Sequence, residues 1–212
     1  MIERGKFAEL HCLSNYSFLR GASHPEELVY KASDLGYSAI AITDECSYSG
    51  LVKAHVAAKQ CGIKLIVGAE FFVDMTHGEE KNSVENIIMI APTRQAYGQL
   101  SAFISKIRRK NQKGNSYLCY EDCQIGLCDC LILWSPELQD IDIQVSVGHK
   151  LKTIFQHFWI TLELFQDGFD IDKTAQALTL SSRLNLRLVA SNNVHTPVSY
   201  THLRAHETVY NR

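Results

Sequence analysis

The strongest constraint on the fold is the regular alternation of strand-like and helix-like segments along the chain. In the first third, the expected strands are 7–13, 38–43 and 64–67, and the expected helices are 24–35 and 51–61. Ser23 and Glu26 form an S-x-x-E capping box with Pro25 in the first turn, and Gly36 ends this helix. Two strand–helix–strand units in so short a stretch predict parallel strands joined by right-handed crossovers.

The alternation continues to the end of the chain, interrupted by a polar, cysteine-rich stretch at 111–129 that reads as an irregular insertion. The expected strands are 87–91, 130–134, 158–164 and 186–191, and the expected helices are 97–107, 138–156 and 171–184. Seven strands, nearly all followed by a helix, predict an α/β fold of the (β/α)-barrel type. An open doubly wound sheet is the alternative, although no G-x-G-x-x-G motif or P-loop follows any strand. No linker marks a second domain.

The charge balance argues against a chain whose main task is to grip nucleic-acid phosphates. The 212 residues carry 21 Lys+Arg and 23 Asp+Glu, a formal charge of −2. The single basic stretch is more typical of a solvated helix end than of a DNA contact; it contains Lys106, Arg108, Arg109, Lys110 and Lys113. No apolar run is long enough to span a membrane and no secretory leader is visible, so we expect a cytoplasmic protein without a membrane partner.

Four of the seven cysteines crowd together in and just after the insertion, as Cys119, Cys123, Cys128 and Cys130. Their gaps of three, four and one residues do not match the paired spacing of zinc knuckles. An odd number of cysteines in a non-secreted chain also argues against a disulfide framework. We therefore expect incidental free thiols, with a zinc site as the alternative.

Polar residues follow several of the predicted strands at the ends where parallel α/β proteins build their sites. They are His11, Asp44, Glu45, Glu70, Asn192, Asn193 and His195. Histidines and carboxylates around a barrel mouth could hold zinc, manganese or iron. In the simpler alternative, Asp44 caps the next turn and His11 is a satisfied strand-end histidine.

Long runs of the chain are similar to the start of the error-prone (DnaE-like) bacterial C-family DNA polymerases. They are residues 7–28, 41–46, 65–71, 159–164 and 188–195. The resemblance implies that residues 1–195 form a PHP (polymerase and histidinol phosphatase) domain, a distorted (β/α)7 barrel. Residues 196–212 have no counterpart in that family. They resemble translated adapter read-through, so we expect a non-native tail.

The chain departs from the family's metal-binding pattern at several positions. The H-x-H pair becomes His11 with Leu13, an acidic ligand becomes Arg20, and the terminal D-x-H keeps His195 but has Asn193 in place of the aspartate. Glu70 matches a ligand and Glu45 replaces a histidine. Asn86 stands at a further histidine position.

These departures predict no bound metal and no catalytic residue, because Leu13, Arg20 and Asn193 have replaced ligands. His11, Glu45, Glu70 and His195 then remain as vestiges of a metal site. Arg20 is expected to pair with Glu45 or Glu70 instead of leaving room for a metal.

The resemblance implies the N-terminal structural module of an error-prone polymerase for damage-induced mutagenesis and translesion synthesis. The palm, its Mg2+ and the contacts with DNA would lie outside this chain. Expected partners are the remaining polymerase domains in cis, with mutagenesis accessory proteins and the sliding clamp as further candidates. The alternatives are an active PHP-type metal-dependent phosphoesterase and a stand-alone scaffold protein.

Overall fold

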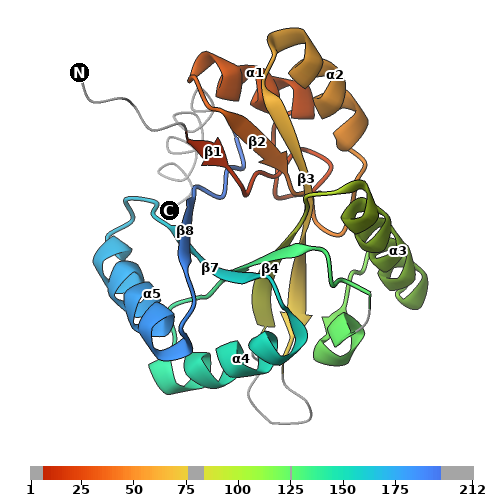
Figure 1. Ribbon diagram of the computed structural model, residues 1–212. Coiled ribbons are helices and arrows are strands. Elements are labelled where there is room, and N and C mark those ends of the chain that lie inside the picture. The colour runs from red at the N-terminus through yellow and green to blue at the C-terminus, as the bar shows by residue number, and fades with distance from the viewer. Residues whose placement is uncertain (1–6, 76–83, 125, 197–212) are drawn as a thin grey trace, which may run out of the picture.

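The computed structural model describes residues 7–75, 84–124 and 126–196, and it shows a mixed sheet curved into a nearly closed barrel with helices on its outside (Figure 1). The strands are β1 (Ala8–Glu9), β2 (Ala39–Ile42), β3 (Lys64–Asp74), β4 (Val84–Ala91), β5 (Leu118–Cys119), β6 (Leu131–Ser135), β7 (Phe158–Glu163) and β8 (Leu188–Ser191). The helices are α1 (Pro25–Asp34), α2 (Leu51–Cys61), α3 (Arg94–Lys110), the 3-10 helix η1 (Tyr120–Gln124), α4 (Ile141–Ile154) and α5 (Asp170–Leu184).

The barrel closes where the chain leaves β8 and meets the residues that follow β1. The strand order is β1-β2-β3-β4-β6-β7-β8, with β5 attached to β3. A parallel bridge joins Cys12 to Val194, with Leu13 N donating to Val194 O at 2.8 Å and Val194 N donating to His11 O at 2.9 Å. The barrel predicted from the alternation of segments is confirmed.

The parallel pairing predicted for the first two strand–helix–strand units is confirmed for β1, β2 and β3, whereas β4 departs from it. β4 is antiparallel to β3, with pairs running from Val67–Ala91 to Asp74–Val84, and it is antiparallel to β6 as well. β3 extends well past the predicted end at Val67, to Asp74, and β4 begins ten positions later at Val84. Antiparallel strands need only a short connection, whereas parallel strands need a crossover, so the geometry follows from the connection.

Helix α2 has the predicted bounds, but the start of α1 is shifted by one residue. The N-cap is His24, whose backbone N–H donates to Glu27 Oε2 at 2.9 Å, so the predicted Ser23/Glu26 box is wrong. Pro25 occupies the first helical position, as its fixed φ favours. Ser23 is instead buried beneath the helix start.

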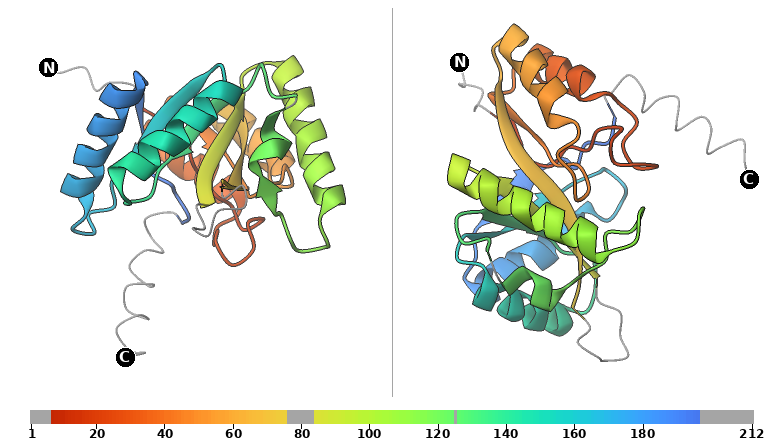
Figure 2. Two further views of the ribbon diagram at one scale, coloured as in Figure 1. Left: turned by 90° about the horizontal axis from the view of Figure 1, so that it is seen from below. Right: turned by 90° about the vertical axis from the view of Figure 1, so that its right-hand side faces the viewer.

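Two apolar layers and one polar layer fill the molecule. Outside the sheet, Trp134 and Phe71 belong to the main core between strands and helices. Inside the barrel, Ile88, Ile90 and Leu133 pack with side chains from the beginnings of the parallel strands. The strand ends on the opposite side of the barrel carry polar side chains, which is where (β/α) barrels place their sites. Figure 2 shows the outer helices from below and from the side.

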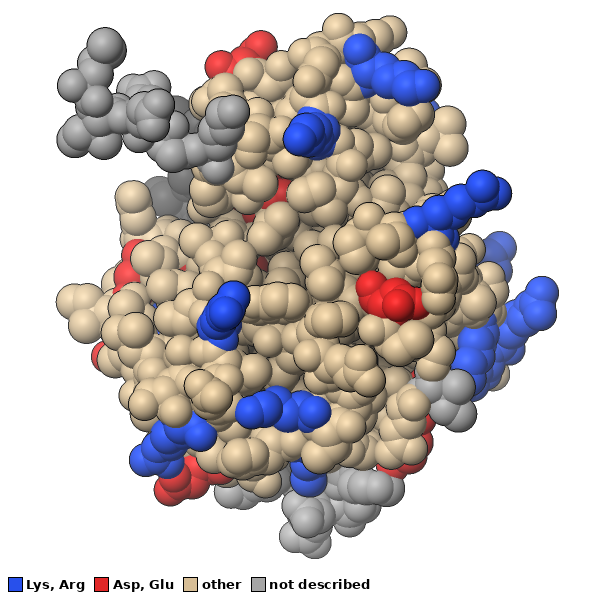
Figure 3. Space-filling view, in the orientation of Figure 1, with Lys and Arg blue, Asp and Glu red and all other residues tan. Residues whose placement is uncertain are grey.

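The insertion at 111–129 is more regular than predicted, because β5 and η1 lie within it. All seven cysteines are free thiols, and Cys119 Sγ donates to Asp122 Oδ2 at 3.0 Å. Lys106 and Lys110 of the basic stretch pair with the same Asp122. On the face drawn in Figure 3, Lys and Arg side chains lie in several separate places. No helix in the described ranges is long and apolar enough to cross a membrane.

Candidate functional site

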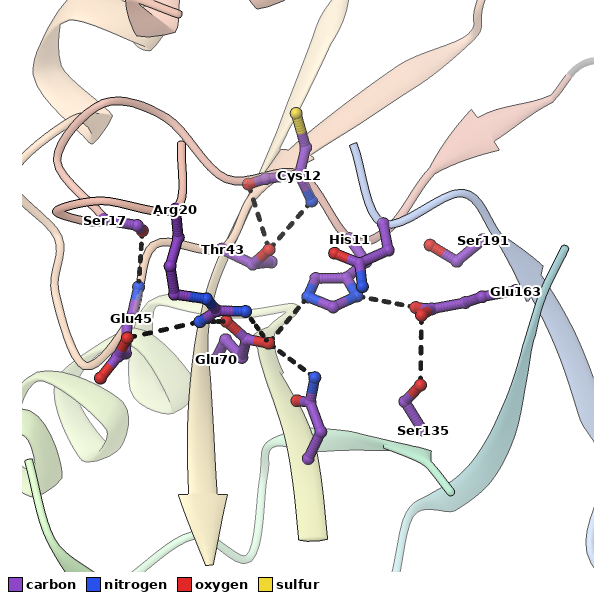
Figure 4. Close-up of polar contacts among 12 residues, drawn as sticks. His11, Cys12, Ser17, Arg20, Thr43, Glu45, Glu70, Ser135, Glu163 and Ser191 are labelled. Carbon is purple, nitrogen blue, oxygen red and sulfur yellow. Dashed lines mark hydrogen bonds and ion pairs between the residues drawn. The ribbon is translucent and has the colours of Figure 1, made fainter. Parts of the chain in front are cut away.

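The centre of the polar layer is a forked ion pair between Arg20 and Glu70. Arg20, on the loop between β1 and α1, places Nη1 2.5 Å from Glu70 Oε2 and Nη2 3.1 Å from Glu70 Oε1 (Figure 4). Nη1 also lies 3.3 Å from Glu45 Oε2, and the guanidinium carbon lies 4.8 Å from the centre of the Phe72 ring. The predicted pairing of Arg20 is therefore confirmed, and it involves both carboxylates.

The loop that carries Arg20 is fixed by a buried carboxylate. Asp44 accepts hydrogen bonds from Ser14 Oγ at 2.7 Å, Ser14 N at 2.8 Å and Ser17 Oγ at 2.7 Å. Glu45 N donates to Ser17 Oγ at 3.0 Å, which joins the same loop to the end of β2. Asp44 therefore holds the loop in place through three hydrogen bonds. This is a larger structural role than the capping of the next turn, which the simpler alternative expects.

His11 lies between two carboxylates at the centre of the barrel. Its Nδ1 donates to Glu163 Oε1 at 2.7 Å, and its Nε2 lies 3.3 Å from Glu70 Oε1, within ion-pair distance but without hydrogen-bond alignment. Burial alone lowers the pKa of His11, but the contacts with Glu163 and Glu70 outweigh burial and raise this pKa to about 9. His11 is therefore an imidazolium at neutral pH.

Glu70 is fully buried and is contacted from three directions. Besides Arg20 and His11, Asn86 Nδ2 donates to Glu70 Oε1 at 2.6 Å. Burial raises the pKa of Glu70, but His11 and Arg20 outweigh it and lower the pKa to about 2. Two positive groups thus hold Glu70 in its charged form.

Several residues of this network were not predicted from the sequence. Glu163 at the end of β7 binds His11 and also accepts from Ser135 Oγ at 3.2 Å. Ser116 Oγ donates to Glu45 Oε1 at 2.7 Å from the insertion. Glu9, almost fully buried in β1, accepts from His11 N at 3.0 Å and from Ser191 Oγ at 2.7 Å. These residues lie inside predicted strands or loops without any motif that marks them.

Of the residues that follow β8, Asn193 lines the same cleft as Arg20 and Glu163. Asn192 Nδ2 donates to Glu9 Oε2 at 2.8 Å, and His195 Nε2 lies 2.8 Å from Asn193 Oδ1. Leu13 is fully buried, and its backbone N–H closes the barrel seam at Val194. His11, Glu45 and Glu70 therefore share one network, and the segment after β8 is tied to His11 through Glu9.

A helix residue outside the barrel supports Glu45. Arg108 in α3 donates from Nε to Cys46 O and from Nη2 to Glu45 O, both at 3.1 Å. Within the basic stretch, Arg108 therefore anchors the end of β2 to α3. This contact contributes to the position of the Glu45 carboxylate near Arg20.

A cleft of about 650 Å³ opens over this network. Arg20, Phe72, Asn86 and Glu163 form its inner wall, and Phe165 and Lys173 from the β7–α5 region line its outer part. Lys173 Nζ lies 4.6 Å from the Phe165 ring centre and 2.8 Å from Asp167 Oδ2.

The donor set at this barrel mouth does not fit a multinuclear metal centre. Both oxygens of Glu70 already accept from Arg20, and the guanidinium lies between Glu70 and Glu45 where a cation would be bound. Leu13 offers no donor atom. In the described part of the chain, no three His, Cys, Asp or Glu side chains are grouped so that they could hold a metal ion.

Comparisons with known proteins agree with this architecture. The PHP domain family matches residues 9–153. Proteins named error-prone DNA polymerase from Methylococcus capsulatus and Teredinibacter turnerae are 44% and 50% identical over 191 and 194 residues. These matches cover 89% and 85% of this chain but only 17% of each relative, so the chain spans about a sixth of their length.

Solved structures with low sequence identity share the fold. An amidohydrolase from Chromobacterium violaceum, solved with bound sulfate and no metal, superposes with a TM-score of 0.70 at 15% identity, covering 91% of this chain and 88% of that one. A protein from Bifidobacterium adolescentis described as a metal-dependent phosphoesterase gives 0.62 at 12% identity, covering 91% and 89%. At such identities the likeness concerns the fold alone.

Proposed function

The chain belongs to the PHP domain family, and from this premise we propose that it is the N-terminal domain of an error-prone DNA polymerase. In this proposal the domain acts through packing, as a structural module, and carries no catalytic residue. Support comes from the error-prone polymerases that match nearly the whole chain at 37–50% identity.

The observation that carries the non-catalytic role is the Arg20–Glu70 ion pair. A trinuclear metal centre brings about six positive charges, which several anionic ligands must offset. Arg20 adds a fixed positive charge that cannot be removed by deprotonation, and it occupies both oxygens of Glu70. Leu13 and Asn193 remove further ligands. We propose that no metal binds here and that the chain lacks phosphoesterase and proofreading activity.

Nucleotidyl transfer would then take place outside this chain. Two-metal catalysis needs paired carboxylates that hold Mg2+, and the proposal places them on a palm that follows the PHP domain. DNA, accessory proteins of mutagenesis and the sliding clamp would be bound by those other domains. Translesion synthesis during DNA repair, in the cytoplasm, is the corresponding role of the whole protein.

The gene sequence downstream of codon 195 tests the polymerase assignment. An open frame that continues into a palm with paired aspartates is the expected result. A native stop codon, or a continuous native gene that encodes residues 196–212 and ends there, would contradict the assignment.

Elemental analysis of the purified chain tests the non-catalytic role separately. We expect less than one equivalent of zinc or manganese and no metal-dependent 3′-exonuclease activity. Two or more equivalents of metal together with that activity would favour the metal-dependent phosphoesterase alternative.

A further inference from the structure

Phe18 and Leu19 form an apolar tip on the loop between β1 and α1. Each of the two side chains is 84% exposed, and the neighbouring Tyr16 is 41% exposed. Leu19 has φ of 63°, a left-handed conformation that non-glycine residues rarely adopt. Adjacent large apolar side chains that are held out in water typically mark a contact surface.

The tip is held outward by hydrogen bonds on both of its sides. Ser17 O accepts from Arg20 N and Gly21 N, both at 3.0 Å, so Phe18 and Leu19 occupy the outer part of a tight turn. Ser17 is bound to Asp44, and Arg20 is bound to Glu70. The buried ion pair therefore fixes the base of a loop whose outermost residues make no apolar contact with the core.

We infer that this tip docks into an apolar socket on the polymerase domains that follow the PHP domain in the same polypeptide. The inference rests on the proposed function. Ala22 N donates to His195 O at 3.1 Å, so the chain that leaves the barrel runs directly beside the loop. The relatives are about six times longer than the matched stretch, which covers 17% of their length. In the proposed full-length protein, the following domains would therefore be connected to the barrel close to the loop that carries Phe18 and Leu19.

The socket is expected to be apolar because the charges near the tip are already paired. Arg20 is neutralised by Glu70 and Glu45, so it offers no free positive charge to DNA. A second copy of the chain and DNA are the alternative binding partners of the tip. The experiment below distinguishes them from the polymerase domains of the same polypeptide.

The test is hydroxyl-radical footprinting of the 212-residue chain and of the full-length polymerase from the same gene. We expect oxidation of Phe18 and Leu19 to fall at least fivefold in the full-length protein. Ile171, which is 82% exposed on α5, is the internal control and should change less than twofold. Unchanged oxidation of Phe18 and Leu19 in the full-length protein overturns the inference and leaves the proposed function intact. A gene without a downstream polymerase refutes the proposed function itself.

A pair of double variants of the full-length polymerase tests the contact functionally. F18S/L19S should raise the rate of limited proteolysis after residue 195 at least tenfold, whereas I171S/L178S should leave it within twofold. Thermal unfolding of the 212-residue chain should be the same for wild type and F18S/L19S, since both side chains are exposed. Equal proteolysis of the two double variants overturns the inference. The inference is also overturned if Phe18 and Leu19 are protected from oxidation only when the chain dimerises or when DNA is added.

Discussion

Arg20 and Glu70 meet side by side, with two parallel N–H···O contacts of 2.5 and 3.1 Å across 50 residues of sequence. Because the guanidinium is planar, two parallel contacts fix the orientation of the Arg20 side chain relative to the Glu70 carboxylate as well as the distance between them. Glu70 is fully buried, and the Arg20 side chain is 26% exposed. One fixed cation thus lies between the carboxylates of Glu70 and Glu45 at the mouth of the barrel.

Replacing Arg20 by alanine should lower the free energy of unfolding by about 3 kcal/mol, because a buried carboxylate loses its main partner. Arg20→Lys should cause a smaller loss, since lysine keeps the charge but cannot form the fork. Urea denaturation of the three proteins measures both changes. If Arg20→Ala unfolds at the wild-type urea concentration, the pair contributes nothing to stability.

The stability of the chain should depend on pH through His11 and Glu70. The pKa of His11 is raised from 6.5 to about 9, so its contribution is complete below pH 6.5 and is lost as the pH rises through 9. The pKa of Glu70 is lowered from 4.5 to about 2, so its contribution is complete above pH 4.5 and is lost as the pH falls through 2. These two groups favour the native state most between pH 4.5 and 6.5.

The matched variant for this pH dependence is His11→Gln, which cannot titrate. Between pH 6.5 and 9 the wild type should lose stability on the order of 3 kcal/mol from this one group. His11→Gln should be less stable at pH 6 and should show a flatter profile over the same range. Urea denaturation at each pH measures the free energy of unfolding of the two proteins. If this free energy depends on pH with the same slope in both, His11 is not charged in the native state.

Gly21→Ala should destabilise the protein, whereas Gly98→Ala should not. A Cβ on Gly21 would lie 1.9 Å from the carbonyl oxygen of Ser14, so the loop would have to move, at a cost of about 1–3 kcal/mol. Gly98 lies in α3 with open space around its Cβ position, and alanine there should stabilise the helix by roughly 0.5–1 kcal/mol. Thermal unfolding should therefore shift in opposite directions. Shifts of the same sign would contradict the crowding at Gly21.

Metal-ligating side chains placed at positions 13, 20 and 193 should create metal binding. The triple variant L13H/R20D/N193D places donor atoms at the three substituted positions. At metal concentrations 100 times its Kd, the variant should gain about 2.7 kcal/mol of stability. Thermal unfolding with and without zinc or manganese, followed by EDTA, measures the gain. Wild type and Arg20→Ala serve as controls, and an equal gain in wild type would contradict the loss of the site.

The local parts of the fold could be predicted because they depend on neighbouring residues. The bounds of α2 follow from its apolar face and from Gly62, whose φ of 76° ends the helix. The α1 cap was misplaced by one residue because Ser23/Glu26 and His24/Glu27 both fit the spacing. Only the structure shows that the His24 backbone N–H meets Glu27.

The non-local parts could not be predicted in the same way. β4 looks like the other buried strands, and its antiparallel direction depends on pairing with β3 and β6. Glu163 lies in a predicted strand, yet its partner His11 is 152 residues away and is reached only when the barrel closes. Arg20 was identified because it departs from a family pattern. The spacing of apolar residues along one sequence does not contain that information.

The seam between Cys12 and Val194 gives the barrel a strict order of assembly during synthesis. The two residues that close it lie near opposite ends of the described chain, so a ribosome must make almost all of the domain before the ring can form. Until then, the β1 and β8 ends of the sheet are not joined by this bridge, and open sheet edges favour association with other chains. A nascent chain that has not yet reached Val194 therefore presents both sheet ends to other chains.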